Sequence, residues 1–294
     1  MTVSHKRIIS NYKVLSSIII GIMILLFSSA FSYRIVSLLF GIIDSGFLYS
    51  VAYYFVNLIS VFICIFLWKR FVLCCTWKDI FLGNPLPNRK WILIAIIIPI
   101  IIICFYFLFV PGSFKIGSID SGAVFQRTVG TVIDVCFVYS VIFGGMILSR
   151  LISVLKWQTA VISSALIYTG YIVFHNVGFN IEGRLLFLVM LGSFIEGVSM
   201  ALVTVSTGSI WSSLVILGIY NIVIADGAVI NISLEEPYES MFAYILEPGN
   251  VFIVGTEMLN TVEVALPSMI GFAVIAFIAL YLIRKERRAL KSDV

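Results

Sequence analysis

The sequence predicts an all-α fold, a polytopic membrane helix bundle of about eight transmembrane helices with both termini in the cytoplasm. Three observations predict it: the composition, the spacing of the apolar runs and the placement of the basic residues. Of the 294 residues, 61% are hydrophobic and 12% are charged, and the mean hydropathy is +1.12. A soluble domain is close to half apolar and about a quarter charged, so the excess apolar surface is expected to face lipid.

Apolar runs recur along the chain, each close to the ~20 residues that cross a ~30 Å hydrocarbon layer as a helix. They are 14–31, 47–68, 91–110, 129–149, 158–176, 185–205, 209–225 and 265–283. Helices are expected because a helix satisfies its own backbone amides, which lipid cannot do. The short Thr207-Gly208 connection predicts an antiparallel hairpin of the sixth and seventh runs.

The basic residues predict the orientation. All but four of the 19 Lys and Arg residues fall in the two termini or in the loops 69–90, 150–157 and 206–208. Cytoplasmic loops carry this excess, so we expect a multi-pass protein of the cell membrane, of bacterial type, with both termini inside. The other four are Arg34, Lys115, Arg127 and Arg184.

The segment 226–264 is the longest stretch outside the apolar runs and is expected to be external. It contains seven acidic residues and no Lys or Arg. Two interpretations stay open: a solvated acidic loop, or a lid that binds cations or peptides. Binding of nucleic acid is not expected, since the chain has no basic stripe with interleaved aromatic residues.

Ionisable side chains inside a span are costly and mark candidate functional sites. They are Asp134 in the fourth run, His175 at the end of the fifth and Glu196 in the middle of the sixth; Asn221 adds a neutral polar group in the seventh. Because they come from four consecutive helices, we expect them to converge on an interior cavity. A His among carboxylates binds a divalent metal or accepts a proton from water. The alternative is that each makes only an interhelical hydrogen bond, worth about 0.6 kcal/mol.

Two short motifs resemble those of a known family. The run from Thr207 to Leu214, Thr-Gly-Ser-Ile-Trp-Ser-Ser-Leu, is similar to the Thr-Gly-Ser-Leu-Trp-Pro-Pro-Ile run of the CPBP family, the CAAX proteases and bacteriocin-processing enzymes also called Abi. Tyr171 to His175 is similar to the family's Phe-x-x-x-His motif. The resemblance covers about half the chain, from about residue 129 to 283. It divides the chain into an N-terminal membrane region of three helices, 1–128, and a CPBP-like core, 129–294.

The resemblance implies intramembrane proteolysis, in which a Glu-Glu-x-x-x-Arg motif activates water and histidines with an Asn or Asp assist. Here the two Glu positions are Tyr139 and Ser140, and the Arg position is Gly144. In the third motif the histidine position is Leu217, while Asn221 is kept. Neither a tyrosine phenol nor an unactivated serine is a base near neutral pH. We therefore expect the family's peptide hydrolysis to be absent or severely weakened.

Three functions remain as hypotheses. The first is a non-catalytic CPBP-like protein that binds a membrane peptide or lipidated protein, in bacteriocin self-immunity or cell-envelope regulation. The second is an active endopeptidase or acyl-transfer enzyme whose site is rebuilt from His175, Asn221 and Glu196. The third is a proton- or cation-coupled transporter with Asp134 and Glu196 as its relay. No cofactor or metal site is expected, although a divalent metal at His175 is left open; the cysteines show no Cys-x-x-Cys spacing.

Overall fold

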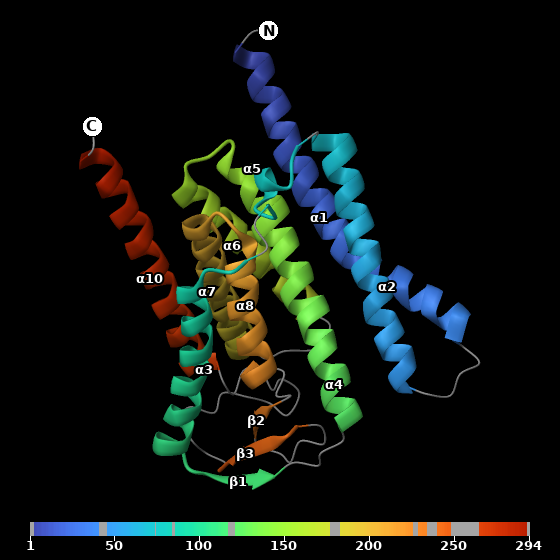
Figure 1. Cartoon of the computed structure of the whole chain (residues 1–294), viewed down its shortest axis with the longest axis vertical. Helices are drawn as coiled ribbons and strands as arrows, with labels where there is room; N and C mark the ends of the chain where they lie inside the picture. Colours follow the sequence, from blue (N-terminus) through green and yellow to red (C-terminus); the bar gives the residue numbers. More distant parts are fainter. Residues whose placement is uncertain are drawn as a thin grey trace.

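The fold is that of a computed structural model of the whole chain (Figure 1). It describes residues 3–40, 46–73, 75–83, 86–116, 121–176, 183–225, 229–233, 240–247 and 265–292. Seven helices in these ranges are long and apolar enough to cross a membrane, and Ile210–Ile224 is a shorter apolar helix. This confirms the prediction of an all-α polytopic bundle. Because lipid offers the backbone no partners, each apolar run closes its hydrogen bonds within a helix.

Most helices follow the predicted runs closely, whereas the first extends beyond its run 14–31 at both ends and the last extends beyond residue 283. In chain order they are α1 (Val3–Phe40), α2 (Gly46–Leu67) with the π-helical turn η1 (Trp68–Leu73), α3 (Arg89–Phe109), α4 (Ser121–Gly130), η3 (Thr131–Val138), η4 (Ser140–Ile147), α5 (Leu148–Ile152), α6 (Trp157–Asn176), α7 (Gly183–Thr207), α8 (Ile210–Tyr220), η6 (Asn221–Ala225) and α10 (Ala265–Ser292). Elements α4, η3, η4 and α5 succeed one another as one candidate span, Gly122–Ile152, which is the most buried of the seven. Within this span, η3 and η4 are π-helical over 8 residues each.

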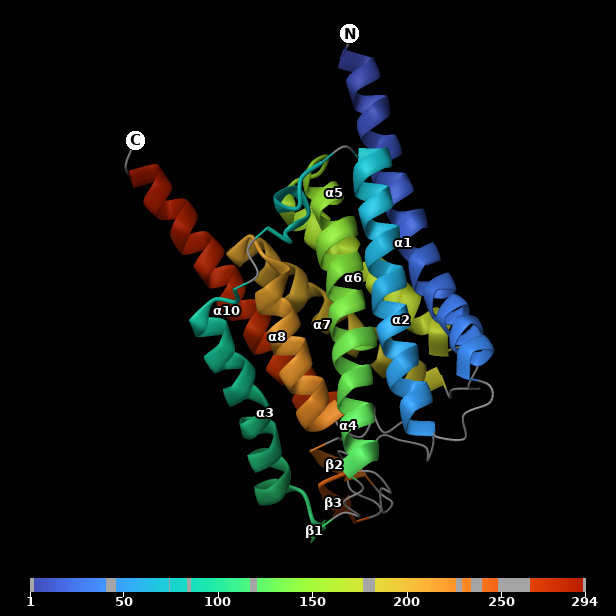
Figure 2. The same cartoon turned by 45° about the vertical axis from the view of Figure 1, so that its right-hand side comes forward.

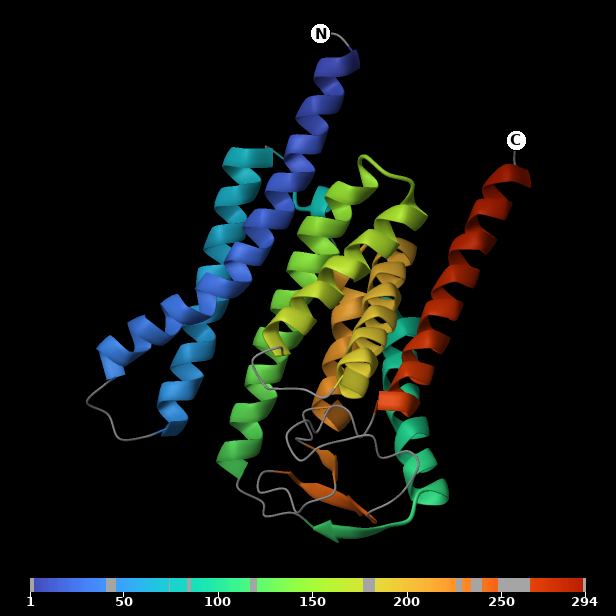
Figure 3. The same ribbon diagram turned by 180° about the vertical axis from the view of Figure 1, so that it is seen from behind.

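The span through α4 and η4 lies between two groups of helices. The pair α1 and α2 lies on one side of the bundle, where α1 contacts η4 and α2 contacts α4 (Figures 1 and 3). On the other side, α3 packs against α8 and α10 (Figure 2). Helix α4 runs across residue 128, and the division of the chain at 128/129 stays a prediction.

Both chain ends lie at the same end of the molecule, and a small sheet lies at the opposite end (Figure 1). The seven candidate spans and the shorter helix Ile210–Ile224 together make an even number of apolar helices, which is consistent with this arrangement. The cytoplasmic side of the termini stays a prediction. The sheet contains β1 (Gly112–Ile116), β2 (Ile230–Ser233) and β3 (Phe242–Leu246), in the order β1-β3-β2. Strand β1 pairs antiparallel with β3, and β2 pairs parallel with β3. These strands were not predicted from the sequence, and two of them belong to the segment expected to be a loop.

The predicted hairpin of the sixth and seventh runs is present as α7 and α8. Gly208 takes a φ of +64°, a left-handed conformation that costs glycine nothing. Ser209 caps α8, its hydroxyl accepting a hydrogen bond from the Trp211 amide. The hydroxyls of Thr204 and Ser213 join the two helices at 3.0 Å.

The segment between η1 and α3 folds over the start of α8. Ile80, in a short 3₁₀ turn (Lys78–Ile80), is fully buried. The Ile210 amide donates to the carbonyl of Phe81 at 3.1 Å, which gives one of the free amides at the N-terminus of α8 a partner. This segment therefore fixes the end of the α7–α8 hairpin to the rest of the bundle.

Candidate functional site

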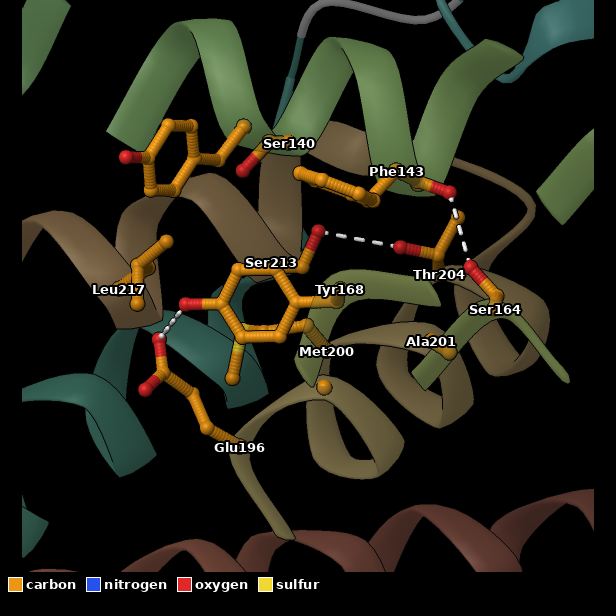
Figure 4. Close-up of a pocket in the computed structure, with 13 residues that line it drawn as sticks. Ser140, Phe143, Ser164, Tyr168, Glu196, Met200, Ala201, Thr204, Ser213 and Leu217 are labelled. Atoms are coloured by element: carbon orange, nitrogen blue, oxygen red, sulfur yellow. Dashed lines mark hydrogen bonds between the residues drawn. The ribbon is translucent and has the colours of Figure 1, made fainter. Parts of the chain in front are cut away.

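A small cavity lies inside the bundle, between η4, α6, α7 and α8 (Figure 4). Its volume is about 30 Å³. A cavity of this size admits one or a few water molecules but no peptide. The lining residues are Tyr139, Ser140, Phe143, Gly144, Ser164, Tyr168, Glu196, Gly197, Met200, Ala201, Thr204, Ser213 and Leu217.

Glu196 is the single carboxyl group among the described side chains that line the cavity. It lies on α7, on the face that also carries Met200 and Thr204 at intervals of four residues. The hydroxyl of Tyr168, on α6, donates a hydrogen bond to Oε1 of Glu196 at 3.0 Å (Figure 4). A carboxyl group inside a membrane bundle needs such a donor, because lipid provides none.

Four residues that the sequence analysis aligned with motif positions of the CPBP family line this cavity. Tyr139, Ser140 and Gly144 come from the span Gly122–Ile152, and Leu217 comes from α8. The Ser140 hydroxyl points into the cavity (Figure 4) and has no hydrogen-bond partner in the part of the chain that the structure describes. A buried hydroxyl usually has a partner, so this atom is available to a water molecule or a polar ligand.

Aromatic rings fill the space beside the cavity. The ring of Tyr139 packs edge-on against Phe143, Tyr168 and Tyr171, with centroids 6.1, 6.1 and 5.7 Å apart. Phe143 and Tyr168 are 5.1 Å apart. Aromatic pairs at these separations contribute about 0.5–1.5 kcal/mol beyond their buried area. Tyr139, which the sequence analysis aligned with the first motif glutamate, is thus a partly buried ring packed against the core.

Three further hydroxyls on the cavity wall have partners. The Ser164 hydroxyl, on α6, donates to the carbonyl of Phe143 at 3.2 Å. Thr204 and Ser213 bond each other, as described for the hairpin. These hydrogen bonds therefore join α6 to η4, and α7 to α8. Ser140 and Glu196 face the space that remains.

Of the four polar side chains that were predicted to converge on an interior cavity, Glu196 lines this one. Asn221 is buried, but its amide donates to the Leu217 carbonyl of its own helix at 2.8 Å, and it does not line the cavity. The side chains of Asp134 and His175 lie outside the described residues. Among the side chains that are described, no group of three His, Cys, Asp or Glu residues is placed to hold a metal ion.

Tyr168, the hydrogen-bond partner of Glu196, was not predicted from the sequence. A signal for it exists: Tyr168 lies three residues before Tyr171, so the two share one face of α6 with the start of the Tyr-x-x-x-His motif. Thr204 and Ser213 were missed as well, because serine and threonine are common in membrane helices and carry no distinctive spacing.

Comparison of the chain with protein-family models, with curated proteins and with solved structures finds no match. The fold and the cavity define the class: this is a multi-pass membrane-helical protein with a small, mostly apolar cavity inside its bundle, which one carboxyl group and several hydroxyl groups line.

Proposed function

We propose that the chain is a CPBP-like membrane protein whose protease site has become part of the packed core, and that it acts by binding a membrane peptide or a lipidated protein. Bacteriocin self-immunity and regulation of the cell envelope are the roles that the resemblance suggests. The observation that carries the proposal is the Tyr139 ring, which packs into a four-ring cluster where the family keeps its first glutamate.

The size of the cavity supports a non-catalytic function. A protease must bring a scissile peptide bond within about 3 Å of its water and its base. The space of about 30 Å³ next to Glu196 holds water but no peptide backbone. A peptide or lipidated partner would instead be held on the apolar faces that the bundle turns outward, such as those carrying Leu93, Leu108 and Phe277.

The test uses the full chain in proteoliposomes with a fluorogenic peptide that carries a farnesyl chain. We expect the labelled peptide to bind but not to be cleaved above the rate in protein-free vesicles. Binding should be the same for the wild type, Glu196→Gln and His175→Ala. Cleavage by the wild type that Glu196→Gln abolishes would overturn the non-catalytic proposal, and absence of binding would overturn the binding function.

A second candidate is a rebuilt hydrolase, and one observation favours it. The Ser140 hydroxyl, which has no partner among the described residues, and the Glu196 carboxyl face the same water-sized space (Figure 4). In such a site Glu196 would accept the proton of a water molecule that Ser140 helps to hold. Slow cleavage that is lost in Glu196→Gln and reduced in Ser140→Ala would favour this candidate over the first.

A further inference from the structure

A large apolar groove runs between α1 and α2, away from the cavity described above. Its volume is about 990 Å³, at the upper end of the ~300–1,000 Å³ typical of ligand pockets. None of the described residues lines both this groove and the Glu196 cavity. The groove opens outward, since Phe27, Phe31 and Ile63 on its walls are about half exposed and Phe71 is 74% exposed.

The groove is apolar along its length and carries one charge. Arg34 is the single ionised side chain among the described residues of its wall. It lies near the end of the candidate span Tyr12–Leu39, and its side chain is exposed. An arginine near the end of a membrane helix extends its guanidinium to the membrane surface, where the phosphate groups of lipids lie. Its planar fork of donors matches the oxygens of a phosphate group.

The groove is long enough to hold an acyl chain that spans one leaflet. On α1 the wall extends from Ile20 to Arg34, a distance of about 21 Å at ~1.5 Å per residue. One leaflet contributes about 15 Å to a ~30 Å hydrocarbon layer. An acyl chain that starts at a phosphate on Arg34 can therefore lie along the groove from its charged end inward.

The shape of the wall favours an acyl chain over a partner helix. Helices that associate in membranes meet at small residues, which let their backbones approach closely. The wall of this groove also has small residues, but the rings of Phe27, Phe31 and Phe71 project from it, each more than half exposed. A flexible chain passes between such rings, whereas a helix would be held away from the groove floor.

We propose that the α1–α2 groove is a binding site for a phosphate-bearing glycerolipid of the bilayer. Its phosphate binds Arg34, and one acyl chain lies along the groove. The proposal does not depend on the proposed function, because the described walls of the two sites have no residue in common.

The test is native mass spectrometry of the full chain, stripped of lipid in detergent and titrated with phosphatidylglycerol or with diacylglycerol of the same chains. We expect phosphatidylglycerol to bind at least about tenfold more tightly than diacylglycerol, as one charged hydrogen bond of ~1.5 kcal/mol provides. Arg34→Ala should remove that difference, and Arg34→Lys should restore part of it. Arg127→Ala, a basic residue outside the groove, is the matched control and should change nothing.

A second variant tests the groove itself. Ala30 lies on the groove wall, and Ala30→Trp should fill the space and weaken binding of both lipids. Equal binding of the two lipids by the wild type, or unchanged selectivity in Arg34→Ala, would overturn the phosphate contact. Undiminished lipid binding in Ala30→Trp, with its melting temperature unchanged, would overturn the groove as the site.

Discussion

The hydroxyl of Tyr168 donates a hydrogen bond to Oε1 of Glu196 at 3.0 Å and thereby joins α6 to α7 across the cavity. Glu196 is a carboxyl group in the middle of an apolar span, and Tyr168 is buried against the aromatic cluster. The pair shows how one polar residue in the bundle is tolerated: a neighbouring helix supplies the donor that lipid lacks.

Removal of this donor should destabilise the bundle. Tyr168→Phe keeps the ring in place but removes the hydroxyl that donates to the Glu196 carboxyl. We expect the unfolding free energy to fall by about 0.6–1.7 kcal/mol, the range of single interhelical hydrogen bonds in membranes. Glu196→Gln is the control, because an amide oxygen still accepts the bond, and it should cost less. Reversible unfolding in mixed micelles measures both. An equal loss in the two variants would mean that the hydrogen bond is not the stabilising contact.

Gly197 should not tolerate a side chain. A Cβ at this position would lie 3.0 Å from Cδ1 of Tyr168 and 3.1 Å from the backbone Cα of Ala165, so α6 and α7 approach each other here as small residues allow. Gly197→Ala should lower the unfolding free energy by about 1–3 kcal/mol through overpacking. Gly170→Ala on α6 is the matched control, since a Cβ there would meet no described atom within 4 Å. It should be neutral or slightly stabilising, and a cost equal to that of Gly197→Ala would contradict the packing argument.

Substitution of Gly208 should destabilise the α7–α8 turn through backbone strain alone. Its φ is +64° and a Cβ would meet no atom of the described residues within 4 Å, so strain rather than a clash decides the effect. Gly208→Ala should cost about 1 kcal/mol, the penalty of the left-handed conformation for an ordinary residue. Gly208→Asn should cost less, because asparagine tolerates this conformation better. Thermal unfolding distinguishes them, and indifference to both substitutions would exclude a role of the turn in fixing the hairpin.

Asp79 should titrate below the ordinary range. The backbone amide of Thr76 donates to its carboxylate at 2.7 Å and the Thr76 hydroxyl at 2.8 Å, and these bonds lower the pKa of Asp79. The pKa of Asp79 is therefore lower in the folded protein than in the unfolded chain, where it is ~3.9. The ionised carboxylate stabilises the fold at any pH above the unfolded pKa, and this stabilisation is lost as the pH falls through the folded pKa. The chemical shift of the Thr76 amide should follow this titration, with a midpoint below that of a free aspartate. In Asp79→Asn the titration should vanish.

The topology can be tested by labelling. In a variant without native cysteines, Ser113→Cys on β1 should react with a membrane-impermeant maleimide in intact cells. Ser153→Cys, between α5 and α6, should react only after permeabilisation, because the basic loop 150–157 is expected in the cytoplasm. Both serines are exposed, and strand β1 and the α5–α6 connection lie at opposite ends of the molecule (Figure 1). The reverse pattern would invert the predicted orientation.

The class of the protein and the places of its helices could be read from the amino-acid sequence. The predicted apolar runs are helical, because the bilayer leaves the backbone no other way to satisfy its amides. The Thr207–Ser209 turn was readable for a local reason, since Gly208 permits the left-handed conformation that a tight hairpin requires.

Which side chains meet could not be read in this way, because it depends on how the helices pack. Strand β1 pairs with β3 across some 130 residues of sequence, and Ser113 for example lies opposite Ile245. A local sequence pattern cannot predict a pairing at this separation. The placement of Glu196 against Tyr168, and of Asn221 against its own helix, depends on how each helix is rotated about its axis. Hydropathy fixes where a helix crosses the membrane, but the packing of its neighbours fixes that rotation, because lipid contacts all apolar faces with nearly equal energy.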